Sequence, residues 1–328
     1  MRTDLKRSAI LAGAVVLLVA AAGASVAVGA QAIAPAEVWR ALADHAGTND
    51  HLIVREVRVP RTVLGVCVGA ALGLSGALVQ TLTRNPLAEP GVMGVTAGAG
   101  FAITLGGVLG LAGSQAAQLA LAFAGAVLAA LLVYAVGRTA PLRLVLAGIA
   151  LSSVLAGVSL GLRLMLPDVF DEFRFWSVGA LAGREQAPMA LPLLLIAAAL
   201  VGALLVARSL NTLVLGEQVA QGLGSHVTRT RVSVLVIVTV LAGAATAVAG
   251  PIAFVGLMVP HLARRLAGAS IPWLMAYTVA LGPILLLVSD IGSRVLLPTG
   301  EVPVSVVTAF LGGPVLIWAV RRYGAGGL

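Results

Sequence analysis

The sequence alternates between long apolar runs and short polar connections over nearly its whole length. A helix needs roughly 20 apolar residues to cross the hydrocarbon core of a bilayer. By that measure the sequence predicts ten transmembrane helices in a single all-α membrane domain, residues 1–328. Because only 10% of the residues are charged, too few to cover a water-facing surface, a soluble enzyme is excluded. The predicted spans are residues 8–30, 60–82, 92–109, 115–136, 141–165, 187–207, 232–249, 252–266, 271–296 and 304–320.

The first apolar run ends at Ala30-Gln31-Ala32, which resembles a signal-peptidase site. Signal peptides have apolar regions of about 7–15 residues, whereas this run is about 23 residues long. We therefore expect it to be retained as the first span.

The distribution of charge predicts an orientation in the membrane. Ten spans place both chain ends on one side, which would carry 13 basic and 3 acidic residues. The other side would carry 8 arginines and 9 acids. Since cytoplasmic loops are enriched in Lys and Arg, we expect a multi-pass protein of the cytoplasmic membrane with both termini in the cytoplasm.

Few ionisable groups lie within the predicted spans. Asp290 is one helical turn before Arg294, which predicts a local i,i+4 ion pair, with a proton relay as the alternative. The single lysine, Lys6, precedes the first span, so the chain has no Walker A loop of its own. The histidines show no metal-ligand spacing. We expect no catalytic residue, no cofactor and no metal site in this chain, and a partner that supplies the energy.

Glycines recur every four residues in the second span, at Gly65, Gly69 and Gly73. This spacing puts them on one helix face, and small residues let transmembrane helices approach closely. The pattern predicts close helix packing within the subunit.

Two polar regions are candidates for contacts with other proteins. Residues 208–231 are predicted to be cytoplasmic, and residues 215–224 within them are typical of a short helix of small and polar residues. That helix is either a docking site or a plain interfacial helix. Arg58, Arg61 and Arg294 fall at the outer ends of spans, where arginines either anchor the helix or recognise carboxylates.

Eight strings of residues, in a fixed order along the chain, resemble a known family. The strings are RVPR (58–61), GAALGLSG (69–76), NPLAEPG (85–91), LAGIALSS (146–153), FWSVG (175–179), LGE (215–217), GPIAFVGLMVPH (250–261) and EVPV (301–304). In these strings the chain resembles the permease subunits of the iron-siderophore, haem and vitamin B12 type of ABC importer, which are type II importers.

The resemblance implies a homodimer with a pathway along its axis, two copies of a cytoplasmic P-loop ATPase that uses ATP and Mg, and an extracytoplasmic binding protein. It implies that the region between spans six and seven couples to the ATPase. It further implies that outer arginines pair with glutamates of the binding protein, and that the fifth span lines the pathway. The matching residues are Gly216, Glu217, Ala220, Leu223 and Gly224 for coupling, Arg58, Arg61 and Arg294 for docking, and Ser152 and Ser153 for the gate.

The function that follows from the resemblance is import of a metal chelate by alternating access, with a ferric siderophore as the expected cargo. Haem and cobalamin are alternatives that the sequence does not separate. A proton-coupled secondary transporter, which would depend on Asp290, and a non-transporting membrane scaffold or sensor are the rival classes. No feature indicates a nucleic-acid partner.

Overall fold

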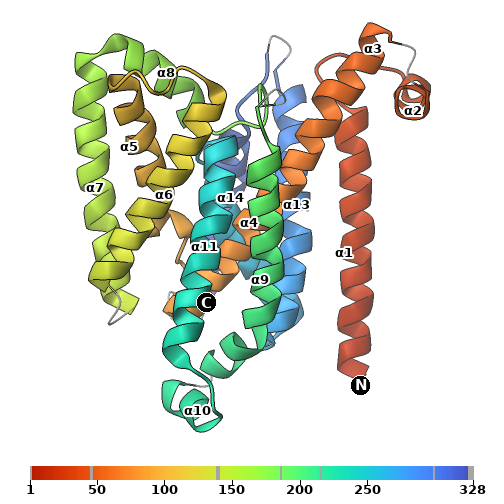
Figure 1. The fold of residues 1–328 in the computed structure, drawn as a ribbon. Helices are drawn as coiled ribbons and strands as arrows, with labels where there is room; N and C mark the ends of the chain where they lie inside the picture. Colours follow the sequence, from red (N-terminus) through yellow and green to blue (C-terminus); the bar gives the residue numbers. More distant parts are fainter. Residues whose placement is uncertain are drawn as a thin grey trace.

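The computed structural model describes residues 2–44, 47–137, 141–184, 187–214, 216–297 and 300–323. Within those residues every regular element is a helix and none is a strand, so the predicted all-α fold is confirmed. Seven helices are long and apolar enough to cross a membrane, and two shorter helices are also apolar. The long helices run side by side (Figure 1), as expected for a multi-pass membrane protein.

The helices fall into a long and a short group. The helices of 20 residues or more are α1 (Arg2–Ala27), α4 (Val59–Thr83), α6 (Gln115–Gly137), α7 (Pro141–Met165), α9 (Ala190–Val214), α11 (Val227–Ala249) and α13 (Ile271–Val295), which belong to the seven candidate spans, and α14 (Val304–Tyr323), whose apolar part is shorter. The shorter ones are α2 (Pro35–Ala43), α3 (Asn49–Leu52), the π-helical η1 (Ile53–Arg58), the 3₁₀-helical η2 (Pro90–Met93), α5 (Val95–Val108), α8 (Pro167–Ser177), α10 (Glu217–Gly222) and α12 (Val255–Ala267).

Two helices extend beyond the predicted spans into the polar region 208–231. α9 continues to Val214, past the expected end at residue 207, and α11 begins at Val227, before the expected start at residue 232. Backbone hydrogen bonds continue a helix through polar residues such as Asn211, whereas hydropathy marks only the apolar part. The polar region therefore consists of two helix ends, α10 and short turns.

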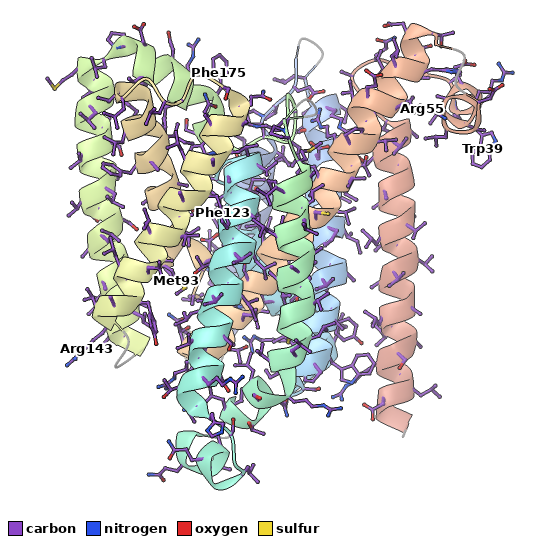
Figure 2. The ribbon with its side chains drawn as sticks, viewed as in Figure 1. Trp39, Arg55, Met93, Phe123, Arg143 and Phe175 are labelled. Atoms are coloured by element: carbon purple, nitrogen blue, oxygen red, sulfur yellow. The ribbon has the colours of Figure 1, made fainter. Side chains whose placement is uncertain are left out.

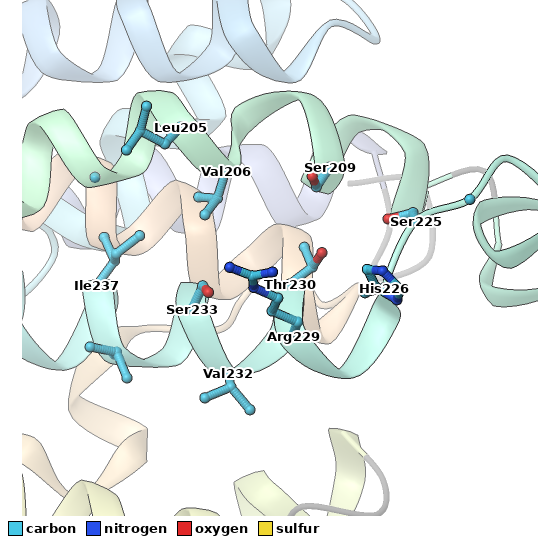
Figure 3. A pocket seen from close by; sticks show the side chains of 13 residues that line it. Leu205, Val206, Ser209, Ser225, His226, Arg229, Thr230, Val232, Ser233 and Ile237 are labelled. Atoms are coloured by element: carbon cyan, nitrogen blue, oxygen red, sulfur yellow. The ribbon is translucent and has the colours of Figure 1, made fainter.

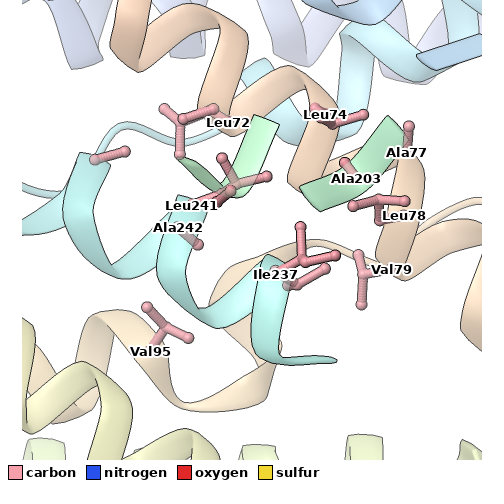
Figure 4. Close-up of a cluster of buried hydrophobic side chains, with 14 of the residues drawn as sticks. Leu72, Leu74, Ala77, Leu78, Val79, Val95, Ala203, Ile237, Leu241 and Ala242 are labelled. Atoms are coloured by element: carbon pink, nitrogen blue, oxygen red, sulfur yellow. The ribbon is translucent and has the colours of Figure 1, made fainter. Parts of the chain in front are cut away.

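The core of the molecule forms around α4, whose most apolar stretch is largely buried. Figure 4 shows apolar side chains of α4 meeting those of α5, α9 and α11. Leu74 and Leu78 from α4 and Leu241 from α11 are almost fully buried in this cluster. α4 and α11 thus form the centre on which the remaining helices pack.

The glycine face of α4 makes the closest helix contacts. A Cβ atom at Gly69 would lie 2.6 Å from the Cα of Pro283 on α13, and one at Gly76 would overlap the backbone of Gly256 on α12. A Cβ atom at Gly73 would lie 2.9 Å from the carbonyl oxygen of Thr278 on α13. The close packing predicted from the glycine spacing is confirmed, because any side chain there would push the helices apart.

α1 and α7 lie at opposite sides of the bundle (Figure 1). In their most apolar stretches only 17% of α1 and 11% of α7 is buried inside the chain. Their exposed apolar surfaces therefore face either lipid or another protein.

The two ends of the bundle differ in the elements that they carry. The N-terminus and α10 lie at one end, and α2, α3 and α8 lie at the other (Figure 1). In Figure 2, Arg143 marks the end of α7 nearer to α10, while Trp39 and Phe175 mark the opposite end. We call these the α10 end and the α2 end.

α11 and α12 are separated by a break at Gly250–Phe254. Gly250 has a φ of 74°, and its position leaves no room for a Cβ because the carbonyl oxygen of Trp176 is in contact with it. Phe254 has a φ of 69°, which is uncommon for a residue with a side chain. The break allows the short α12 to pack against the glycine face of α4.

Candidate functional sites

The predicted coupling segment is a separate short helix, α10, at one extreme of the bundle (Figure 1). Gly216 precedes it with a φ of 117°, and Gly224 follows it with a φ of 78°. The N–H of Ser225 donates to the carbonyl of Ala220, and that of Gly224 donates to the carbonyl of Gln221, each over 2.9 Å. This pair of bonds is the Schellman motif that ends helices at a glycine, so the sharp turns require these glycines.

The faces of α10 differ in exposure. Ala220 is fully buried and anchors the helix, whereas Leu223 is 63% exposed. Val219, which the sequence analysis did not single out, is exposed beside it. The side chain of Glu217 lies outside the described residues. The segment therefore offers apolar side chains on a fixed helix, as a docking surface would.

The three arginines predicted for docking come together at the α2 end. The Nε and Nη2 atoms of Arg61 donate to Oδ1 of Asp290 over 3.1 and 2.8 Å. Its Nη1 atom lies 2.7 Å from Oε2 of Glu301. Arg294 also binds Asp290, so the i,i+4 ion pair expected from the sequence is confirmed.

Two of these arginines, Arg58 and Arg294, also bind the C-terminal end of α1. Nη1 of Arg294 donates to the carbonyl of Ser25 over 2.7 Å, and Nη1 of Arg58 donates to that of Ala27 over 2.6 Å. The last carbonyls of a helix have no intrahelical partner and carry partial negative charge. Arg58 and Arg294 supply the missing donors and the compensating charge.

Burial changes the interpretation of these arginines. Arg58, Arg61 and Arg294 are only 3%, 6% and 3% exposed. Their guanidinium groups contact carboxylates and carbonyls of this chain and so stabilise the fold, while their docking to a binding protein stays a prediction. Glu301 belongs to the EVPV string, but nothing in the sequence indicates that it joins this cluster. We call Arg58, Arg61, Asp290, Arg294 and Glu301 the arginine cluster.

Ser152 and Ser153, the predicted gate residues, lie on the weakly buried α7. The hydroxyl of Ser153 donates to the carbonyl of Ile149 over 3.0 Å. The Oγ atom of Ser152 is buried and has no hydrogen-bond partner within the described chain. Gly157 and Gly161 on the same helix have open space where a Cβ would lie.

Glu89 is a polar residue inside the bundle to which the sequence analysis gave no role. Its Oε1 atom accepts from the backbone N–H of Phe254 over 3.2 Å. Burial raises the pKa of the Glu89 carboxyl, and the bond from Phe254 opposes that shift. A cavity of about 250 Å³ opens beside it and is also lined by Thr96 and Thr246. The hydrogen bond holds Phe254 in its unusual conformation at the start of α12.

The candidate residues form three separate sites, at the α10 end, at the α2 end and on α7. Within the residues that the structure describes, no three His, Cys, Asp or Glu side chains are grouped so that they could hold a metal ion.

The chain is similar to known transport proteins over nearly its full length. A model of the FecCD transport family matches residues 16–322. The ferric enterobactin transport system permease protein FepD of Escherichia coli is 47% identical over 98% of this chain and 97% of its own length. The probable siderophore transport system permease protein YfiZ of Bacillus subtilis is 38% identical over 93% of each chain.

Two further similarities extend the comparison. The hemin transport system permease protein HmuU of Yersinia pestis is 36% identical over 94% of this chain and 93% of its own. Among solved structures, an inward-facing ABC transporter assigned to the metal-chelate type superimposes with a TM-score of 0.85 at 28% identity. That match covers 96% of this chain and 99% of the other.

Proposed function

Because this chain belongs to the FecCD transport family, we propose that it is the permease subunit of an ATP-driven importer that carries a metal chelate across the cytoplasmic membrane. The observation that supports this most is the 47% identity to the ferric enterobactin permease over 98% of the chain. A ferric siderophore is therefore the favoured cargo. Haem is the second candidate, since the hemin permease of Yersinia pestis is 36% identical, and cobalamin is a further alternative.

The functional unit in this proposal is a homodimer that meets along α7. Most of the apolar surface of α7 is not buried within the single chain. Gly157 and Gly161 leave open space on it, and small residues allow helices to approach closely. The translocation pathway would lie between the two copies, with Ser152 and Ser153 near its gate.

The energy would come from two copies of a separate cytoplasmic ATPase that uses ATP and Mg. The chain itself has one lysine, Lys6, and no Walker A loop. α10 would contact that ATPase through Leu223 and its neighbours, which are exposed at the bundle end. The excess of basic residues predicted for this end supports a cytoplasmic location for it and for both termini. The substrate-binding protein would dock at the α2 end.

Transport would proceed by alternating access. ATP binding closes the ATPase dimer, α10 moves with it, and the paired α7 helices exchange inward and outward openings. A nucleotide shifts such an equilibrium only by its differential affinity for the two states. The turns at Gly216 and Gly224 would transmit the movement of α10 to α9 and α11, because the positive φ angles of these two glycines fix the direction of the chain at each turn.

The first test is co-purification of the tagged protein from its native membrane, with the associated chains identified by mass. A P-loop ATPase at one copy per permease is expected. The complex is then reconstituted in vesicles, and ATP-dependent uptake of a radiolabelled ferric catecholate siderophore is measured beside haem. Uptake that survives ATP depletion and collapses with the proton gradient would overturn the proposal in favour of a secondary transporter.

A further inference from the structure

A cavity of about 670 Å³ lies between α9 and α11 at the α10 end of the bundle. Figure 3 shows side chains of both helices, and of the turn that follows α10, around it. None of the residues that line it is a coupling or gate residue except Gly224 at its edge. The proposed transport cycle therefore leaves this space without a role.

One end of the cavity is polar and basic. Ser209, Thr230 and Arg229 line it, and the guanidinium of Arg229 lies near Thr230 and Ser233 in Figure 3. No acidic residue that the structure describes lines the cavity. The hydroxyl of Ser225, also in the lining, is buried and has no hydrogen-bond partner in the described part of the chain.

The start of α11 adds to this positive character. His226 precedes the helix without a side-chain cap, and the first turn contains no acid. The first N–H groups of a helix lack intrahelical partners and carry partial positive charge, which favours an anion. Arg229 lies in this first turn, so a side-chain charge and the helix end act on the same volume.

The other end of the cavity is apolar. Leu205 and Val206 from α9 and Val236 from α11 line it, and Gly202 widens it because a glycine has no side chain. Leu205 and Val236 are exposed on helices that are apolar enough to span a bilayer. This surface continues from the cavity toward the region where acyl chains would lie.

We propose that the cavity binds an anionic phospholipid, with the headgroup phosphate at Arg229 and Ser225 and an acyl chain along Leu205 and Val236. Arginine and hydroxyl donors suit a phosphate. A free anion would use only the basic end, and a peptide would leave its backbone groups unpaired at the apolar end. The inference concerns lipid binding and holds whichever chelate the protein carries.

The test is native mass spectrometry of the purified protein, titrated with phosphatidylglycerol or with phosphatidylcholine of the same acyl chains. We expect tighter binding of phosphatidylglycerol. The variant Arg229→Gln should weaken that binding about tenfold, the loss expected for one charge-assisted hydrogen bond. The matched control is Arg208→Gln, which removes an exposed arginine of α9 that does not line the cavity and should bind as the wild type does.

A second variant tests the apolar end without a change in charge. Gly202→Leu has space for a Cβ but projects further atoms into the cavity, so it should also weaken phosphatidylglycerol binding. Excess inorganic phosphate should leave the lipid bound. Equal affinity for the two lipids, equal behaviour of the two arginine variants, or displacement of the lipid by inorganic phosphate would each overturn the proposal.

Discussion

Removal of the Asp290 charge should destabilise the fold, because this carboxylate is the shared acceptor of two buried guanidiniums. Asp290 is fully buried and binds both Arg61 and Arg294. Removal of one partner of a buried ion pair costs about 3–5 kcal/mol, since it leaves a charge without compensation. In Asp290→Asn, Arg61 keeps Glu301 and Arg294 keeps the carbonyls of α1. We therefore expect a loss of about 3 kcal/mol.

The assay is denaturant titration of the purified protein in mild detergent, followed by tryptophan fluorescence. The matched variant is Glu301→Gln, which removes the other carboxylate of the arginine cluster. Because Glu301 is 30% exposed, water screens its pairing, and the expected cost is at most about 1 kcal/mol. The double variant Asp290→Asn/Arg294→Gln should recover part of the loss. Equal costs for the two single variants would refute the reasoning, and Asp290→Asn with full stability but no transport would indicate a proton relay instead.

Three further predictions concern the helix contacts, the coupling surface and Glu89. Gly76→Ala should prevent folding, since its Cβ would overlap the backbone of Gly256, whereas Gly23→Ala has open space and should elute normally in size-exclusion chromatography. Leu223→Arg should reduce co-purification of the ATPase while the permease stays folded, because Leu223 is exposed; unchanged recovery would count against α10 as the docking surface. Burial raises the pKa of Glu89 in the folded state, so the free energy of unfolding should fall as the pH rises above the ordinary pKa of a glutamate. Glu89→Gln should abolish that fall in a pH series of unfolding titrations, and an unchanged pH dependence would contradict the assignment.

The helices could be predicted from the sequence because hydropathy is a local property. The fifth span was expected at residues 141–165, and α7 covers Pro141–Met165. The ends of α9 and α11 could not be placed, because their backbone bonds continue through residues that are polar but still helical. Likewise, the glycine spacing indicated a packed face of α4 but not its partners, which come from α12 and α13 far along the chain.

Only part of the arginine cluster could be predicted from the sequence. The pair Asp290–Arg294 was predictable since it lies within one helical turn. The partner of Arg61 was not, because 229 positions separate it from Asp290. An arginine at the end of a span can be exposed to water or buried against other helices. The contacts that decide between these two states arise only in the tertiary fold.

The position of α1 explains why so many charges are buried at the α2 end. α1 is mostly exposed in its apolar part, and in lipid the hydrophobic effect does not drive one apolar helix onto another. Specific polar contacts therefore add to the van der Waals packing that holds it. Tyr277 donates to the carbonyl of Arg7 near its start over 2.9 Å, and Ser25 bonds to Thr62 near its end over 2.8 Å. Arg58 and Arg294 complete the attachment at the last carbonyls. Arg58 and Arg294, which the sequence predicts to dock a partner, thus also fasten the first helix of the chain to its core.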